Sequence, residues 1–115
     1  MHVACSMNRP DFVQLLLNFD CDPHQRDDDG NFPLQICAFH GHIKCMKYLI
    51  DYVREKTKER HKILSFVNQR SDKKLLRSSP LLFAATEGRY EAVKMLTKNG
   101  ADINLLDDLS ENSGM

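Results

Sequence analysis

Apolar residues in this chain recur at helical spacing, in pairs of short segments that are punctuated by proline and glycine. Between positions 33 and 53, Pro33 suits the first turn of one helix and Gly41 suits the left-handed cap that ends it. The apolar stripes of the two segments are Leu34, Cys37 and Ala38, then Ile43, Met46, Leu49, Ile50 and Val53. Gly30 before them suits a tight turn with positive φ. The pattern predicts two short antiparallel helices that must stack on neighbours to bury their stripes.

This pattern occurs three times. Residues 1–5 align with residues 34–38 at an offset of 33, and the same offset takes Asn8 to Gly41. The third copy begins at Ser79 and lies 47 positions beyond the second, so 14 further residues are inserted between them. A fixed period of this length is the mark of a repeat array, in which stacked copies share a continuous core.

The motifs within the period resemble those of the ankyrin repeat family. They are Phe32-Pro33-Leu34-Gln35, Gly41-His42, Ser79-Pro80-Leu81-Leu82, Asn99-Gly100-Ala101-Asp102-Ile103-Asn104 and, more weakly, Cys21-Asp22-Pro23-His24. The resemblance implies an all-α solenoid of stacked helix-turn-helix units with hairpin-like finger loops. The family's histidine stands only at His2 and is replaced by Gln35 and Leu82, so we expect its usual hydrogen-bond network to be partial.

The resemblance divides the chain into repeats and one insertion. The expected units are repeat 1 at 1–33 (truncated at its start), the helix pair of repeat 2 at 34–53, a charged helical insertion and finger at 54–78, repeat 3 at 79–106, and the start of a further repeat at 107–115. Both ends look like cuts through a longer array. We therefore expect apolar end surfaces and only marginal stability for the isolated piece. In repeat 1 we expect the inward-facing residues to be Val3, Ala4, Phe12, Leu15 and Leu16.

The insertion is the basic part of an otherwise acidic chain. Residues 51–78 hold nine Lys or Arg and four Asp or Glu, although the whole chain has a formal net charge of +0. Residues 54–62 are rich in good helix formers. We expect the outer helix of repeat 2 to continue for several turns, with Val67-Asn68 rejoining the repeat pattern. The basic surface that the insertion is expected to present is Arg54, Lys56, Lys58, Arg60 and Lys62.

Composition limits the class of protein. A chain of 115 residues suits one small domain, and no apolar run reaches the roughly 18 residues that span a bilayer. No signal peptide is evident at the N-terminus. The four cysteines, Cys5, Cys21, Cys37 and Cys45, are too few for a disulfide framework and contain no C-x-x-C pair. We interpret them as reduced thiols and expect a cytoplasmic location.

Two candidate metal sites have structural explanations, and nothing beyond composition supports a Cys/His nucleophilic pair. Cys37, His40, His42 and Cys45 are residue types that bind zinc, but the two cysteines fall at small core positions of the repeat, where cysteine acts as a small hydrophobe. Asp27-Asp28-Asp29-Gly30-Asn31 is similar to part of a calcium loop but lacks the terminal carboxylates. No phosphate-binding glycine loop or paired carboxylate motif is present. We therefore predict no enzyme activity, no metal and no cofactor.

The family resemblance implies a protein-interaction or scaffolding module that binds partners on its concave face of fingers and inner helices. The variable surface positions that carry over are Ser6, Met7, Asp28, Asp29, Asn31, Phe39, His40, Thr86 and Glu87. Phe39 is either an anchor for a partner or a packing residue against a neighbouring finger. The expected partner is another protein or neighbouring repeats of the same chain, with no nucleic acid and no membrane insertion.

Two alternatives stay open. The array can be the cytosolic ankyrin region of a channel of the transient-receptor-potential kind, where it serves assembly or mechanical coupling. The basic segment 54–62 is either a solvated helical face or a binding surface for anionic lipid, acidic protein or RNA. Glu55 and Glu59 interrupt it, and no aromatic residue lies within it to stack on bases.

Overall fold

The computed structural model of the chain describes residues 1–27, 30–69 and 79–103. Within them the regular elements are helical, and no strand is found. The helices are α1 (His2–Ser6), α2 (Pro10–Asn18), α3 (Pro33–His40), α4 (Ile43–Lys56), α5 (Arg60–Val67), α6 (Pro80–Thr86) and α7 (Tyr90–Lys98). The expected all-α class is confirmed.

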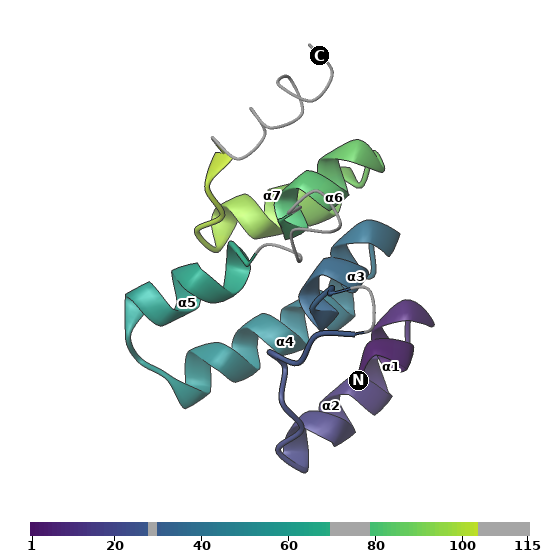
Figure 1. Ribbon diagram of the computed structural model, residues 1–115, viewed down its shortest axis with the longest axis vertical. Coiled ribbons are helices and arrows are strands. Elements are labelled where there is room, and N and C mark those ends of the chain that lie inside the picture. The colour runs from purple at the N-terminus through teal and green to yellow at the C-terminus, as the bar shows by residue number, and fades with distance from the viewer. Residues whose placement is uncertain (28–29, 70–78, 104–115) are drawn as a thin grey trace.

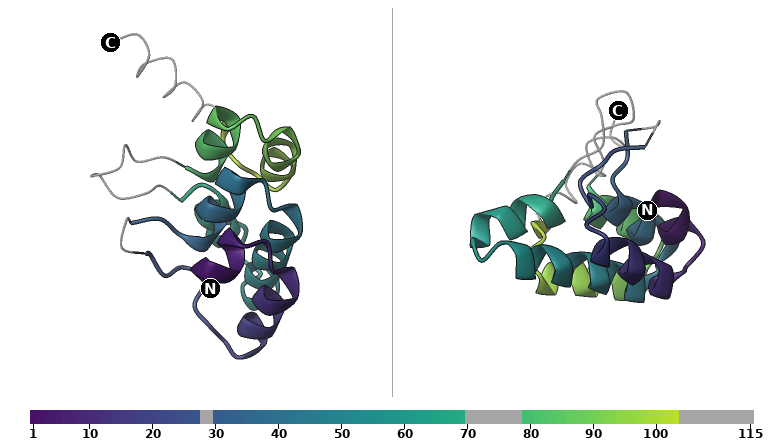
Figure 2. Two further views of the ribbon diagram at one scale, coloured as in Figure 1. Left: turned by 90° about the vertical axis from the view of Figure 1, so that its right-hand side faces the viewer. Right: turned by 90° about the horizontal axis from the view of Figure 1, so that it is seen from below.

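The helices form stacked antiparallel pairs, α1 with α2, α3 with α4 and α6 with α7 (Figure 1). The short inner helices pack on one another in the order α1, α3, α6, and the outer helix α4 packs along α2. Figure 2 shows the inner and outer helices as two layers, with the loop before α3 projecting from the inner layer. The expected solenoid of helix-turn-helix units is therefore the observed architecture.

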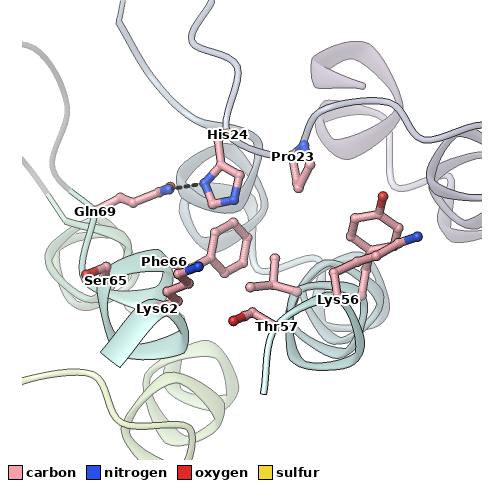
Figure 3. Close-up of a pocket in the computed structure, with 10 residues that line it drawn as sticks. Pro23, His24, Lys56, Thr57, Lys62, Ser65, Phe66 and Gln69 are labelled. Carbon is pink, nitrogen blue, oxygen red and sulfur yellow. Dashed lines mark hydrogen bonds between the residues drawn. The ribbon is translucent and has the colours of Figure 1, made fainter. Parts of the chain in front are cut away.

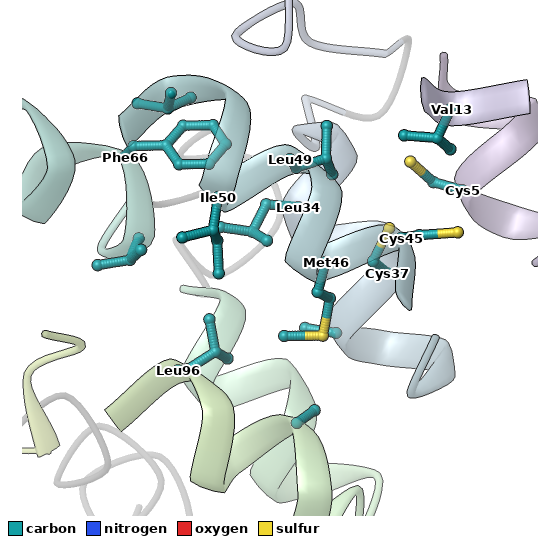
Figure 4. Close-up of a cluster of buried hydrophobic side chains, with 14 of the residues drawn as sticks. Cys5, Val13, Leu34, Cys37, Cys45, Met46, Leu49, Ile50, Phe66 and Leu96 are labelled. Carbon is teal, nitrogen blue, oxygen red and sulfur yellow. The ribbon is translucent and has the colours of Figure 1, made fainter. Parts of the chain in front are cut away.

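The core runs through the stack and is densest around the middle pair (Figure 4). Leu34, Met46 and Leu49 have no exposed surface, and Ile50 has 2%. Burying a side chain of this size stabilises the fold by about 1.5–3 kcal/mol relative to leaving it exposed. The middle pair is buried because α1 and α2 cover one side of it and α6 and α7 the other.

The first pair differs from the sequence expectation. Ala4 is buried and Leu16 half-buried as predicted, but Val3 is 71% exposed, Phe12 55% and Leu15 47%. The buried positions of this pair also include Cys5, Val13 and Leu17. The prediction was wrong for Val3, Phe12 and Leu15 because a residue of a stacked pair is buried only where a neighbouring pair covers it. This pair has a neighbour on one side within the described residues.

The outer helix of repeat 2 and the insertion form two helices, where one long outer helix was expected. Helix α4 has 14 residues, against nine in α2 and nine in α7, so it does extend beyond its counterparts. It then stops at Thr57, whose backbone is extended with φ −126° and ψ 134°. Helix α5 turns back and packs against α4, which buries Phe66 and Val67. A straight extension would carry these two apolar side chains away from the core, so the hydrophobic effect favours the break.

The junction between inner and outer helix has the same backbone conformation in each pair. Asn8, Gly41 and Gly88 occupy one repeat position and have φ values of 55°, 73° and 69°. Glycine takes this left-handed region without steric cost, and asparagine is one of the few other residues that tolerate it. The residue after the junction ties neighbouring pairs together. His42 Nδ1 donates to Cys5 O at 2.6 Å, and Arg89 Nε donates to Phe39 O at 3.2 Å.

A second set of polar contacts holds each loop to its inner helix. His2 Nε2 donates to Gln25 O at 2.8 Å, and the repeat-equivalent Gln35 donates through Nε2 to Gln69 O at 3.3 Å. Gln35 is fully buried and its Oε1 also accepts from Phe32 N at 2.7 Å. The glutamine therefore makes the loop contact that His2 makes in repeat 1, and adds a second bond at the start of its own helix. The two matching bonds place Gln69 at the repeat position of Gln25, so 11 of the inserted residues precede it.

Gly100 tests the packing between the insertion and repeat 3. Its φ is 102°, and a Cβ there would collide with Leu64 Cδ2, whereas a Cβ on Gly88 would meet nothing within 4 Å. We expect Gly100→Ala to lower the free energy of unfolding by about 2–4 kcal/mol and Gly88→Ala by about 1–2 kcal/mol. Urea unfolding followed by circular dichroism measures both. Equal losses would show that Leu64 moves aside without cost.

Gln35 tests the loop contacts. We expect Gln35→Leu to lower the free energy of unfolding by about 1–3 kcal/mol, because the buried Phe32 N–H loses its acceptor. Gln35→His introduces the residue that stands at His2 and should recover part of the loss. The same unfolding measurement separates the two variants, and a histidine variant no more stable than the leucine variant would contradict this account.

Candidate protein-interaction surface

The inner helices present one aromatic cluster between repeats 2 and 3. Phe39 on α3 and Phe83 on α6 meet edge to face, with ring centroids 5.9 Å apart. A hollow of about 170 Å³ lies beside them and is lined by Asn31, Gln35, Ile36, Phe39 and Phe83. Phe39 remains 37% exposed. Its ring therefore contacts the inner helix of the neighbouring repeat and keeps an open face, and its role as an anchor for a partner stays a prediction.

The loop before α3 sets one wall of this hollow. Asp27 N donates to Asn31 O at 2.8 Å, and Asn31 N donates to Asp27 Oδ1 at 2.9 Å, which closes a hairpin-like turn. Arg26 stacks over the Phe32 ring, 4.4 Å from its centroid, and donates to Gly30 O. The side-chain oxygen of Asn31 is buried and accepts no hydrogen bond from the described residues. A buried acceptor without a donor is costly, and such groups mark sites that a ligand or water can complete.

Histidines and an arginine lie at the end of α3. His40 and His42 stack with ring centroids 5.3 Å apart, and the Phe39 ring lies 5.1 Å from that of His40. Burial and the nearby charges of His42 and Arg89 lower the pKa of His40 from its ordinary value, while Glu87 acts in the opposite direction. The neutral form of His40 is therefore favoured, and the guanidinium of Arg89 lies at this edge of the aromatic cluster.

The predicted partner-binding residues fall into three groups. Asn31, Phe39 and His40 lie together around the aromatic cluster. Ser6, Met7, Thr86 and Glu87 are exposed where α1 and α6 end. Asp28 and Asp29 lie outside the described residues. The surface role of the whole set stays a prediction.

Two residues of the cluster were absent from that prediction. Ile36 and Phe83 line the hollow and occupy the repeat position of Val3. The repeat register was the available signal, since one inner-helix position holds valine, isoleucine and phenylalanine in turn. The repeat pattern places Val3 of this set in the core, whereas the packing of α3 on α6 shows that Ile36 and Phe83 border the surface.

The predicted basic surface divides into two. Lys56 and Lys62 line a hollow of about 500 Å³ between the loop after α2, the end of α4 and α5 (Figure 3). Its floor includes Pro23, Val53 and Phe66. Both lysines have acidic neighbours, Lys56 with Asp20 at 3.4 Å and Lys62 with Glu59 at 3.6 Å. Arg54, Lys58 and Arg60 instead line a groove toward α7.

The cysteines have structural positions. Cys5, Cys37 and Cys45 are fully buried and lie near one another between the first two repeats (Figure 4), and all four cysteines are free. Burial raises the pKa of the Cys37 thiol well above its ordinary value, which leaves it protonated and a poor nucleophile. Among the residues that the structure describes, no group of three or more His, Cys, Asp or Glu side chains is placed to hold a metal ion.

The comparisons with known proteins agree with this architecture. A family model described as ankyrin repeats, in three copies, matches residues 1–107, so the chain belongs to the ankyrin repeat family. The ankyrin repeat is a protein-interaction fold. None of the helices in the described ranges is long and apolar enough to cross a membrane.

The chain is similar to two curated proteins with different functions and to one solved structure. The chain is 29% identical over 102 residues to the human transient receptor potential cation channel subfamily A member 1, covering 89% of the chain and 9% of the channel. It is 30% identical over 104 residues to the human NF-kappa-B inhibitor alpha, covering 90% of the chain and 30% of that protein. The chain thus spans under a third of either relative.

The structural neighbour has the same fold. It comes from the crystal structure of the yeast ribosomal protein Rps3 in complex with its chaperone Yar1, with a TM-score of 0.79 and 18% identity, and the match covers 91% of this chain and 71% of that one.

The titration of His40 tests the electrostatics of this surface. Arg89→Gln should raise the pKa of His40 toward 6.5, and Glu87→Gln should lower it further. Because the folded pKa lies below the unfolded value, His40 takes up its proton more readily in the unfolded chain, so stability falls as the pH drops through about 6.5. NMR titration of the imidazole protons measures both shifts, and shifts of the same sign would contradict the charge assignment.

Proposed function

We propose that the chain captures a partner protein on the concave face, with Phe39 as the anchor of the contact. The observation that carries this proposal is the open aromatic cluster. Phe39 is 37% exposed and held edge to face against Phe83, beside a hollow lined by Asn31, whose buried side-chain oxygen accepts no hydrogen bond from the described part of the chain. Energetically dominant residues of interfaces are typically aromatic side chains that are held in place before binding.

Charge would set the choice of partner. Asp27 lies in the finger turn next to Asn31, and Asp28 and Asp29 follow it in the sequence. The proposed set also includes Ser6, Met7, Thr86 and Glu87 at the rim. Charges at a rim mainly change the association rate and the selection among partners. A partner segment with an apolar side chain for the Phe39 cluster and basic residues toward the finger fits this arrangement.

The relatives support a binding role. The NF-kappa-B inhibitor alpha is named for the factor that it inhibits, and the solved structure holds Yar1 with the protein that it chaperones. The partner proposed for this chain is another protein or neighbouring ankyrin repeats of the same chain. We place this chain in the cytosol, where thiols stay reduced, because its four cysteines are free.

A second candidate function rests on the likeness to the transient receptor potential channel. It covers 89% of this chain at 29% identity, although only 9% of the channel. In this case the repeats would serve subunit assembly or mechanical coupling, and membrane-spanning helices would follow them in the full-length sequence. That sequence distinguishes the two candidates directly.

The concave-face proposal is tested with two single variants in a pull-down. We expect Phe39→Ala to reduce capture of a specific partner at least about tenfold, which corresponds to the roughly 1.4 kcal/mol or more lost at an anchor residue. Tyr90→Ala is the matched control, because Tyr90 is an aromatic side chain that is 73% exposed on α7. Quantitative mass spectrometry of the retained proteins provides the readout, after circular dichroism has shown that both variants are folded. Equal retention by the two variants would refute Phe39 as the anchor.

A further inference from the structure

The outer side of the array carries a basic groove that neither the family fold nor the concave-face proposal explains. Two adjoining hollows, of about 480 and 390 Å³, share Arg54, Lys98 and Asn99 in their linings. Together they run between α4, the start of α5 and α7. The groove exists because α4 meets α7 over only a short stretch, whereas it packs along α2. Helix α5 then closes one end of it through Ile63 and Leu64.

The cations of the groove come from separate parts of the sequence. They are Lys47 and Arg54 on α4, Lys58 and Arg60 at the turn into α5, and Lys94 and Lys98 on α7. The acidic residue in the lining is Asp51. None of the six cations is ion-paired with a described residue, in contrast to Lys56 and Lys62 on the other side of the insertion. Arg54 donates to the side chain of Asn99 and so spans the groove.

Helix electrostatics explain only part of this cluster. Arg54 and Lys98 lie in the last turns of α4 and α7, where a cation favourably meets the negative end of the helix dipole. Lys47 and Lys94 lie further back in their helices, and Lys58 and Arg60 stand around the N-terminus of α5, where positive charge is unfavourable. Among the described residues, Asp51 is the one acidic residue that lines the groove with the six cations, so their charge is compensated only in part, an arrangement that a bound anion would stabilise.

We propose that this groove binds an acidic segment of a partner protein, one in which Asp or Glu alternates with apolar side chains. The segment should carry apolar side chains because the groove lining includes Ile50, Ile63, Leu64 and Met95 together with the cations. The lining holds no aromatic side chain, so it lacks the stacking platform that single-stranded nucleic acid uses. The cations face one another across a groove, which suits an extended chain and not the plane of a membrane.

The test uses synthetic probes against the whole chain. The main probe is a fluorescein-labelled peptide that alternates Glu with Leu, and the comparison probes are the Gln-Leu peptide, oligouridine of equal charge, and phosphatidylcholine vesicles containing phosphatidylserine. Fluorescence anisotropy and vesicle co-sedimentation measure binding. We expect the Glu-Leu peptide to bind at least about tenfold more tightly than either the Gln-Leu peptide or oligouridine, with affinity that falls as salt is added.

Matched charge variants locate the site. The groove variant is K58E/R60E/K94E, and the control is K44E/K56E/K62E, which changes net charge equally at residues outside the groove. We expect the groove variant to weaken binding of the Glu-Leu peptide by about 10–100-fold and the control by less than about threefold. Circular dichroism checks the fold of each variant. If the groove variant unfolds at a lower temperature than the unmodified chain, the single variant K94Q replaces it, because Lys94 is exposed. K94Q should weaken binding of the Glu-Leu peptide by a smaller factor.

Three outcomes would overturn the proposal. Equal loss in the two triple variants would mean that net charge alone drives binding. Tighter binding of oligouridine would assign the groove to nucleic acid, and preferential capture of the anionic vesicles would assign it to a membrane surface. The Phe39→Ala variant should bind the Glu-Leu peptide normally, so this test is independent of the concave-face proposal.

Discussion

The structure depends on the burial of the α3–α4 pair between two similar pairs. A helix of eight residues such as α3 is too short to be stable alone, and its persistence comes from packing on α1 and α6. Each helix pair buries apolar surface against the pair on either side of it. The stability is therefore shared among the interfaces along the stack and is lowest for a pair with one face uncovered. The first pair shows this directly. Val3, Met7 and Phe12 border an apolar hollow of about 350 Å³ on its outer side.

The insertion gives this array its distinctive surfaces. Because α4 ends at Lys56 and α5 folds back, the basic residues of the insertion are distributed over two sides of it. One side is an apolar hollow with paired lysines, and the other is the groove against α7, whose cations make no ion pair with the described residues. Asn68 joins this segment to repeat 3, accepting from Asp102 N at 2.8 Å and donating to Gly100 O at 3.3 Å. The insertion is therefore joined to the loop after α7 by side-chain hydrogen bonds.

Two proposed binding surfaces follow from different physical features. The concave cluster offers exposed aromatic area on rigid inner helices, which favours contacts that are slow to dissociate. The outer groove offers concentrated positive charge, which favours rapid and salt-sensitive association. An array with both can hold one partner through two segments, in which case the second contact benefits from the effective concentration created by the first.

Periodicity alone was enough to predict the helix pairs, their junctions at Asn8, Gly41 and Gly88, and the placement of Cys37 and Cys45 in the core, because backbone sterics and apolar spacing act over a few residues. Phe39 lies outside the apolar stripe in the sequence, and the structure leaves it 37% exposed. The tertiary structure decided which apolar residues are covered, as the exposed Val3 and Phe12 show. It shows that Gln35 bonds to the loop carbonyl that corresponds to the partner of His2. It also decided that α5 folds back and that Lys94 on α7 joins Lys58 and Arg60. These outcomes depend on which surfaces meet across repeats, and local spacing carries no information about a neighbour that is distant in the chain.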